Sequence, residues 1–141
     1  MFTTECVIEE VEPTWELEKY AYGGFLRHSV ETFGFDGDVN SFAFAVKEEE
    51  ETIGVIMAKT FYGALHIKQL FLEKKLRGKG YGTQLMNKAM KRGKELGCSF
   101  VHLETMNFQA LKFYQKLGFT LEYTREGYHQ GVSMHYLRKP L

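Results

Sequence analysis

The sequence predicts a mixed α/β (α+β) fold in which residues 1–141 form a single domain. The chain has 141 residues, 44% hydrophobic and 26% charged, which is typical of one soluble globular domain with one core. Apolar runs of strand length near both ends are separated by short turns, which indicates antiparallel hairpins. Between them, a strand, a glycine-rich turn, a helix and another strand follow in order, and this order predicts a right-handed parallel β-α-β crossover.

The first third of the chain is predicted to hold a helix and a loop. Residues 7–11 are a weak strand candidate because glutamates interrupt them. Pro13 and Thr14 then open a helix, with Thr14 as a suitable N-cap. Gly23-Gly24 is expected to bend or break this helix, and residues 33–39 form a loop suited to a substrate lid. The helical residues expected to face the core are Leu17, Tyr20, Ala21, Phe25 and Leu26.

Three strands are predicted next, as an antiparallel meander over residues 41–47, 52–61 and 65–72. The acidic run 48–51 reads as a solvated hairpin tip, and Gly63 marks a tight turn into the third strand. These strands make up the N-terminal half of the expected sheet.

The second half continues with a helix after Gly82 and a strand over residues 99–105. Gly97 is a natural stop for that helix, and Asn107 is expected to cap a last helix that Gly118 closes. Residues 119–125 and 132–138 then form a terminal hairpin. The apolar face of the first of these helices is formed by Leu85, Met86, Ala89, Met90, Gly93 and Leu96.

Charge and composition exclude several classes of function. Lys plus Arg and Asp plus Glu both total 18, so the net charge is zero, which argues against nucleic acid or a membrane surface as a partner. Cys6 and Cys98 do not make a disulfide framework, and no cysteine or histidine spacing indicates a metal, so no metal is expected. No signal peptide or bilayer-spanning run is found, so we expect a cytoplasmic protein.

The apolar strand 65–72 leads into the turn Arg77-Gly78-Lys79-Gly80-Tyr81-Gly82 and then into a helix. A glycine turn at a helix N-terminus directs backbone N–H groups and the helix dipole at an anion, and nearby lysines and arginine add positive potential. The turn lacks both the Gly-x4-Gly-Lys-Ser/Thr pattern of a nucleotide-triphosphate loop and the third glycine of a dinucleotide fingerprint. The alternative is a solvated basic turn.

This turn resembles the Arg/Gln-x-x-Gly-x-Gly/Ala signature of the GCN5-related N-acetyltransferases, the GNAT family. The stretch from Asn107 to Phe119 resembles the family's second signature, Asn-x-x-Ala-x-x-x-Tyr-x-x-x-Gly-Phe. Both occur in the family's order, and the resemblance covers about residues 52–137. It implies acetyl-coenzyme A (acetyl-CoA) as the co-substrate and direct transfer of the acetyl group to an amine.

The resemblance also implies roles for individual residues. The strand ending at Leu72 would bind the pantetheine arm between splayed parallel strands, residues 78–83 the pyrophosphate, and Asn107 the pantetheine. Tyr114 would protonate the leaving sulfur, because a phenol with a pKa near 10 is a donor at neutral pH; the alternative is a packed helix tyrosine. The residues placed at acetyl-CoA are Leu70, Phe71, Leu72, Arg77, Gly78, Lys79, Gly80, Tyr81, Gly82, Thr83, Asn107, Ala110, Phe113 and Tyr114.

Two residues are candidates for the general base that deprotonates the amine, and water is a third. His66 is expected on the same pleat face as Lys68, Leu70 and Leu72, and the resemblance places it where histone-acetylating members carry a glutamate. Glu104 shares a strand face with His102 near the cleft. The structural alternatives are a histidine satisfied by a neighbour and a glutamate paired with a lysine.

The sequence therefore predicts an acetyl-CoA-dependent N-acetyltransferase whose acceptor is a primary amine, on a small molecule rather than a protein. The acceptor pocket is expected to use the first helix, residues 33–39 and the terminal hairpin around Tyr128. The alternatives are a non-catalytic acetyl-CoA sensor or scaffold, and a transferase of longer acyl groups or to hydroxyl acceptors. A homodimer is also expected from the resemblance.

Overall fold

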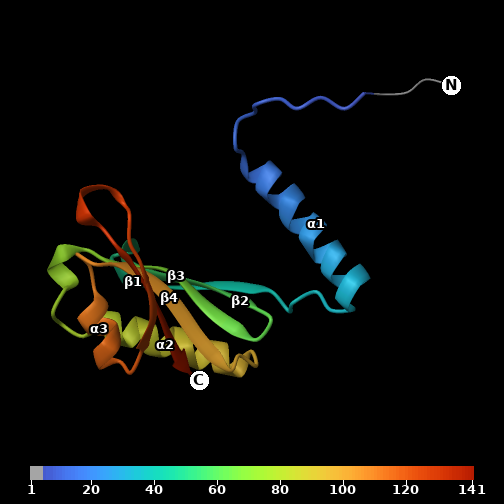
Figure 1. The fold of residues 1–141 in the computed structure, drawn as a ribbon. Helices are drawn as coiled ribbons and strands as arrows, with labels where there is room; N and C mark the ends of the chain where they lie inside the picture. Colours follow the sequence, from blue (N-terminus) through green and yellow to red (C-terminus); the bar gives the residue numbers. More distant parts are fainter. Residues whose placement is uncertain (1–4) are drawn as a thin grey trace. The chain divides into compact units, whose positions relative to one another are not determined.

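The computed structural model describes residues 5–141 and divides the chain into two compact units, one ending at Asp36 and the other spanning Gly37–Leu141. Figure 1 shows the elements of both units in chain order. The elements are α1 (Trp15–Phe33), β1 (Asn40–Glu48), β2 (Glu51–Phe61), β3 (Ala64–Leu72), η1 (Lys74–Leu76), α2 (Tyr81–Glu95), β4 (Phe100–Met106), α3 (Leu111–Lys116), β5 (Thr120–Arg125), η2 (His129–Gly131) and β6 (Met134–Pro140).

The first unit is built on the single helix α1. The Thr14 side chain accepts a hydrogen bond from the Leu17 N–H at 3.3 Å, which confirms the predicted cap, and Gly34 ends the helix with φ +79°. Residues 5–14 have no regular structure, so the strand predicted at 7–11 is wrong. Its glutamates leave it without the continuous apolar face that a strand needs.

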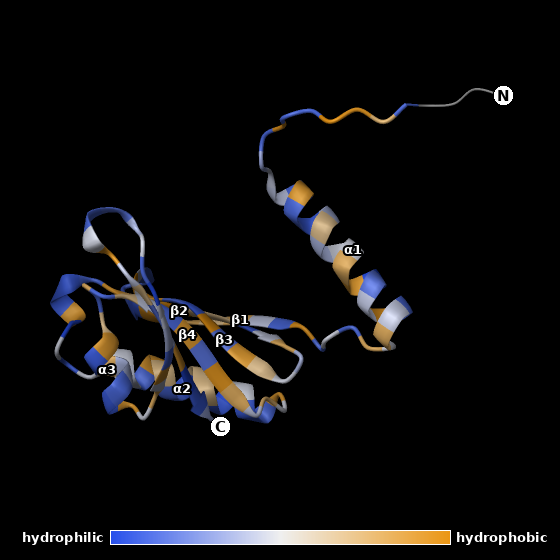
Figure 2. Cartoon of the chain, in the orientation of Figure 1, coloured by the Kyte–Doolittle hydropathy of each residue, from blue (hydrophilic) through white to orange (hydrophobic). Residues whose placement is uncertain are grey.

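The helix α1 runs unbroken through Gly23-Gly24, so the predicted kink is also wrong. Each glycine costs roughly 1 kcal/mol relative to alanine in a helix, which weakens the helix without bending it. No residue of α1 is buried, which contradicts the expectation that Leu17, Tyr20, Ala21, Phe25 and Leu26 face the core. The hydrophobic core belongs to the second unit alone, and the apolar residues of α1 are visible in Figure 2.

The second unit is a six-stranded sheet in the order β1-β2-β3-β4-β6-β5. The pairs β1/β2, β2/β3, β4/β6 and β5/β6 are antiparallel, and β3/β4 is parallel. This arrangement confirms the predicted hairpins at both ends of the sheet and the parallel crossover through α2. The acidic hairpin tip is also confirmed, since Glu49 and Glu50 take φ +49° and +73° as a two-residue turn requires.

The core lies between one face of the sheet and the helices α2 and α3 (Figure 1). The predicted apolar face of α2 is buried from Gly82 to Gly93, except that Leu96 is only partly buried. Gly93 allows close packing, because a Cβ there would lie 2.6 Å from Leu65 Cδ2. The largest fully buried side chains are Ile56, Leu65, Met86, Leu103, Leu137 and Val101.

The parallel strands β3 and β4 separate after a short paired stretch. Their register holds for three pairs, Ala64 with Phe100, Leu65 with Val101 and His66 with His102, although both strands continue beyond them. The splay implied by the family resemblance is therefore present. It opens the sheet next to the residues that were predicted to form the site.

The strand β3 also contains a β-bulge against β2. Met57 pairs with Gln69, whereas Ala58 pairs with Ile67, so Lys68 is an extra residue. An extra residue moves the following side chains to the opposite face of a strand.

None of the helices within residues 5–141 combines the length and the apolar character that a membrane-spanning helix needs.

Candidate active site

The glycine turn joins the end of β3 to the start of α2. It runs from Arg77 to Gly80, and Gly80 is the N-cap residue of α2. Gly78 and Gly80 have φ +74° and +88°, in the left-handed region that costs a residue with a Cβ about 1 kcal/mol or more. Nothing lies within 4 Å of a Cβ built at either position. The backbone conformation, and not crowding, therefore requires glycine at both.

The N-terminus of α2 is arranged to receive an anion. Its first turn contains no acidic residue and no side-chain cap, and the Gln84 N–H is already bonded to the Gly80 carbonyl at 3.1 Å. The N–H groups before Gln84 point beyond the helix end, where the dipole is positive. Gly82 also allows a close approach, since a Cβ there would lie 3.2 Å from Phe113 Cζ.

Two of the basic residues near the turn are held by neighbours. The Arg77 Nε donates to the Leu72 carbonyl at 3.1 Å, which ties the turn to the end of β3. Lys75 forms an ion pair with Glu48 at 2.7 Å, so its ammonium is directed at the β1–β2 hairpin. The acidic run thus neutralises one cation of the basic segment.

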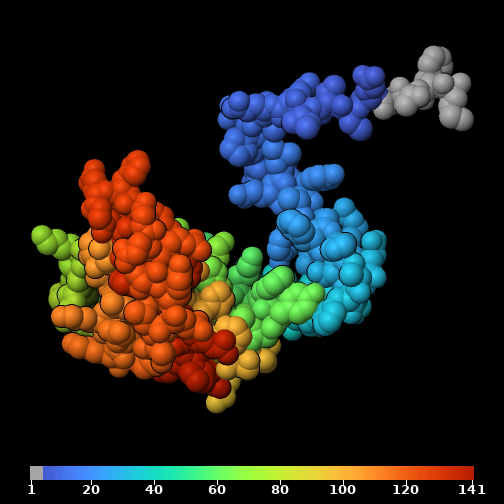
Figure 3. Space-filling model, in the orientation of Figure 1, coloured from blue at the N-terminus to red at the C-terminus, as the bar shows by residue number. Residues whose placement is uncertain are grey.

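A cavity of about 700 Å³ extends from this turn along the end of β3 to α3. Figure 3 shows the segments that carry the turn and α3 side by side on the surface of the second unit. Lys79 and Asn107 are the two predicted acetyl-CoA residues that do not line the cavity. Three lining residues were not predicted: Leu76, Phe108 and Gln109. Phe108 and Gln109 occupy variable positions of the second signature, so the motif itself gave no signal for them.

Tyr114 lies in the wall of this cavity on α3. It is 8% exposed and its ring packs edge-on against Phe113 and Phe119, at centroid distances of 5.1 and 5.8 Å. Burial raises the pKa of the Tyr114 phenol, so the hydroxyl keeps its proton at neutral pH. The site therefore contains a protonated donor next to apolar walls. The Tyr114 ring is also packed against its neighbours, as expected for a purely structural tyrosine.

Asn107 has a different structural position from the one predicted. The helix α3 begins at Leu111 with no side-chain cap, so Asn107 is not its cap. Its Nδ2 donates to the Gly131 carbonyl at 3.1 Å, and its Oδ1 accepts from the Ser133 N–H at 3.2 Å. Asn107 therefore fastens the loop after β4 to the β5–β6 connection, which projects as a loop in Figure 3. Its expected contact with pantetheine stays a prediction.

The two candidate bases lie together on the splayed strands. His66 Nε2 is 2.8 Å from Glu104 Oε2, with 29% and 32% of the two side chains exposed. The His66 and His102 rings stack in parallel at 4.6 Å, because the two residues are register partners on β3 and β4. Glu104 thus pairs with His66 and not with a lysine. The neighbour that satisfies His66 is therefore the other base candidate, and the lysine partner expected as the alternative for Glu104 is wrong.

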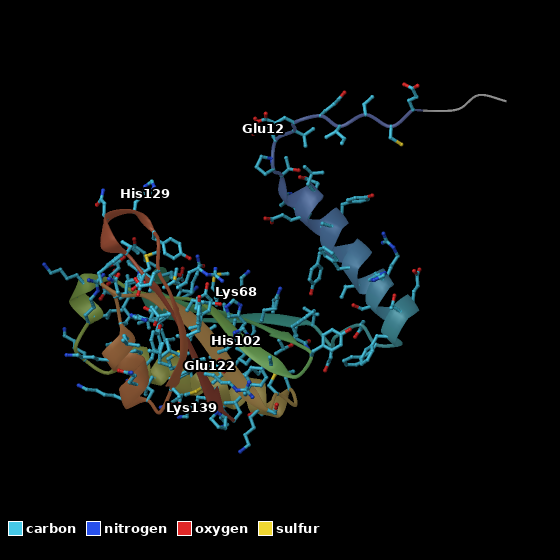
Figure 4. The ribbon with its side chains drawn as sticks, viewed as in Figure 1. Glu12, Lys68, His102, Glu122, His129 and Lys139 are labelled. Atoms are coloured by element: carbon cyan, nitrogen blue, oxygen red, sulfur yellow. The ribbon has the colours of Figure 1, made fainter. Side chains whose placement is uncertain are left out.

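His102 completes this cluster and is labelled in Figure 4. Burial, and then the neighbouring His66, lower the pKa of His102, so its imidazole is held neutral. The sequence carries only a partial signal for this residue, because His102 alternates with Glu104 on one strand, whereas its place beside His66 follows from the register of β3 and β4.

The predicted pleat face of His66 is wrong because of the bulge at Lys68, which is labelled in Figure 4. Leu65 and Ile67 are buried in the core, and Leu70 and Leu72 pack against the same core. His66 alternates with Leu65 and Ile67, so it faces the side of the sheet away from α2. The base candidates and the cavity-lining leucines therefore occupy opposite faces.

The comparisons with known proteins agree with this architecture. Residues 6–119 match the sequence model of the acetyltransferase (GNAT) family. The chain belongs to this family. The GNAT match includes both signatures and the whole segment from the glycine turn to Phe119, so the cavity and Tyr114 fall within it.

Individual relatives support the same assignment. The chain is 33% identical over 99 residues to blasticidin-S acetyltransferase of Streptomyces morookaense, covering 70% of this chain and 73% of the relative. A crystal structure from Agrobacterium tumefaciens, assigned as an acetyltransferase, is 24% identical with TM-score 0.85 over 98% of this chain and 100% of its own. A Bacillus anthracis structure assigned as a streptothricin acetyltransferase, with acetyl-CoA bound, is 24% identical with TM-score 0.65, covering 72% and 63%.

Proposed function

We propose that this GNAT protein transfers the acetyl group of acetyl-CoA to a primary amine of a small molecule. The observation that carries the proposal is the cavity of about 700 Å³, which joins the glycine turn, the end of β3 and Tyr114. Its ends differ in chemistry, with backbone donors at the N-terminus of α2 and apolar walls from Leu70, Leu72 and Phe113. A long ligand with an anionic pyrophosphate at one end and a thioester at the other fits this distribution.

The reaction that we propose is a direct attack in a ternary complex. The amine nitrogen forms a bond to the acetyl carbon, the carbon–sulfur bond breaks, and the departing thiolate takes the proton of the Tyr114 hydroxyl. The raised pKa of Tyr114 keeps that proton available. Neither cysteine lines the cavity among the described residues, which agrees with the absence of an acyl-enzyme step.

We further propose that His66, supported by Glu104, takes the proton that the amine must lose. If the Glu104 carboxylate accepts from Nε2–H of His66 at 2.8 Å, the Nδ1 atom of the ring carries the free lone pair. Glu104 then orients the ring and stabilises the imidazolium, and water can carry the proton between the amine and Nδ1. Glu104 itself and bulk water remain the alternative bases.

One of the relatives bears on the class of acceptor. The relative named blasticidin-S acetyltransferase supports a small-molecule acceptor. The acceptor pocket around α1, residues 33–39 and Tyr128 stays a prediction, as do a cytoplasmic location and a homodimer. We also propose that both units belong to one domain, because the family match at 6–119 crosses the boundary after Asp36.

Calorimetric titration with acetyl-CoA, with ATP and NADH as controls, tests the proposal. We expect selective binding of acetyl-CoA, followed by release of free thiol when amines such as blasticidin-S are added. Selective binding without turnover over a broad panel of amines would instead support the sensor alternative. Turnover of hydroxyl acceptors or of longer thioesters would support the other acyltransferase alternative.

A further inference from the structure

Three side chains with metal-ligating atoms meet on the sheet face away from α2. His66 lies on β3, and His102 and Glu104 lie two residues apart on β4. One ligating atom from each of the three lies within 4.8 Å of the others. His66 and His102 are the last register pair before the splay, so the paired backbones fix two of the three residues relative to each other.

We propose that His66, His102 and Glu104 form a binding site for a divalent transition-metal cation, with Zn²⁺ as the best match. Two imidazole nitrogens and one carboxylate oxygen are ligands that zinc accepts, whereas calcium and magnesium prefer oxygen ligands alone. Three protein ligands leave the fourth tetrahedral position open to water or to a substrate amine.

The ligand atoms already lie close together, but one ring must turn before both histidines can bind one ion, because the His66 and His102 rings stack with an interplanar angle of 3° and direct their lone pairs along parallel planes. Ligand atoms on one tetrahedral zinc ion lie about 3.4 Å apart, given metal–ligand bonds of about 2.1 Å. Nε2 of His66 and Oε2 of Glu104 are already 2.8 Å apart, and the His102 ring stacks at 4.6 Å. The His66 and Glu104 side chains are partly exposed, so they can rotate about χ1 and χ2 to admit an ion from solvent.

The charges around the cluster set its affinity. Glu104 supplies one negative charge within the cluster, and Glu122 adds a further negative potential at His102, whereas Arg138 opposes it. The Arg138 guanidinium is drawn over the Phe100 ring, 3.9 Å from its centroid, which is a cation–π contact. Apart from His66, the charged side chains that act on His102 are therefore two carboxylates and one guanidinium.

A bound cation would occupy the lone pairs of His66 and Glu104, so it would inhibit acetyl transfer. This inhibition rests on the proposed function, whereas cation binding itself does not. The two can therefore fail separately, and the decisive measurement is direct binding and not activity.

The experiment is a titration of the full chain with Zn²⁺ against a chromophoric chelator, in a Cys6→Ser background that removes an exposed thiol. We expect one site per chain, and His102→Asn should weaken it on the order of tenfold or more. The matched control is His129→Asn, which changes a histidine in the β5–β6 connection, outside the cluster, and should leave the affinity unchanged. Circular dichroism melts establish that each variant is folded.

A second readout replaces Zn²⁺ with Co²⁺. The visible d–d absorption of Co²⁺ reports a site of low coordination number with nitrogen and oxygen ligands. We expect this absorption in the Cys6→Ser protein and its loss in Glu104→Gln. The proposal is overturned if Zn²⁺ does not bind below millimolar concentration, or if the folded His102→Asn protein binds as tightly as its parent. Binding without inhibition would retain the site and contradict the role of His66 as base.

Discussion

The two faces of the sheet at the splay carry chemistry assembled in different ways. On the face toward α2, the glycine turn and Tyr114 come from two contiguous motifs, and their residues line one cavity. On the opposite face, His66, His102 and Glu104 meet only because β3 and β4 are register partners. A contiguous motif specifies its site in the local backbone, whereas the cluster depends on a long-range register that a sequence alone does not specify.

The largest expected effect comes from the glycine turn on the α2 side of the sheet. Gly80→Val places a β-branched residue at φ +88° at the N-cap of α2, and we expect the affinity for acetyl-CoA to fall about 100-fold or more, since such strain costs about 1–3 kcal/mol and displaces the N–H groups. Calorimetry measures the affinity. Gly97→Val is the matched control, because Gly97 has φ +90°, equally open surroundings and no place in the cavity. Equal loss in both variants would contradict an anion role for the turn.

The next effect concerns Tyr114, the proposed acid in the cavity. Tyr114→Phe keeps the packing on Phe113 and Phe119 but removes the proton donor, so we expect kcat to fall about 100-fold with little change in the dissociation constant of acetyl-CoA. Because burial raises the pKa of Tyr114, its alkaline loss of activity should begin above the pH at which an ordinary tyrosine ionises. Steady-state kinetics over pH test both points. Tyr123→Phe, an exposed ring on β5, serves as control, and a normal kcat in Tyr114→Phe would assign the proton to water.

A smaller effect is expected from the cluster of His66, His102 and Glu104 on the opposite face of the sheet. Glu104→Gln removes the charge that supports His66 but keeps the shape of the side chain, and we expect kcat/KM to fall about tenfold. The measurement is made at fixed ionic strength with saturating acetyl-CoA. Glu95→Gln, which changes an exposed acidic residue at the end of α2, outside the cluster, is the matched charge control. No loss in Glu104→Gln would favour water as the base.

The smallest effect is expected at Asn107, which belongs to the second signature but forms hydrogen bonds with the β5–β6 connection. Asn107→Ala removes hydrogen bonds to Gly131 and Ser133, and we expect the free energy of unfolding to fall by about 1 kcal/mol. Asn107→Asp retains the acceptor for the Ser133 N–H and should be intermediate. Urea titration measures the stability of each. Full stability in Asn107→Ala would show that these bonds are replaced by solvent, and a selective loss of acetyl-CoA affinity would support the predicted pantetheine contact.

Much of the fold could be predicted because its signals are local. Alternating apolar residues and glycine turns identified all six strands, and the crossover rule oriented β3 and β4. The errors arose where the conformation depends on contacts with residues distant in the sequence. The bulge at Lys68 comes from pairing with β2 and reversed the face of His66. The Asn107 side chain bonds to the backbone of Gly131 and Ser133 instead of capping α3. The helix α1 continues through Gly23-Gly24, although two adjacent glycines lower its helix propensity.

The splay also divides the amide protons of β3 into two classes. Beyond His66, this strand retains its antiparallel neighbour β2, but in residues 5–141 no register partner on the β4 side is found for it. Beyond the bulge at Lys68, alternate amides between residues 69 and 72 should therefore exchange with deuterium within the time of ordinary local fluctuations, while those bonded to β2 exchange only when the sheet opens. An extended ligand lying along this edge would slow every second amide and leave the others unchanged, so protection would appear as a period of two along the strand.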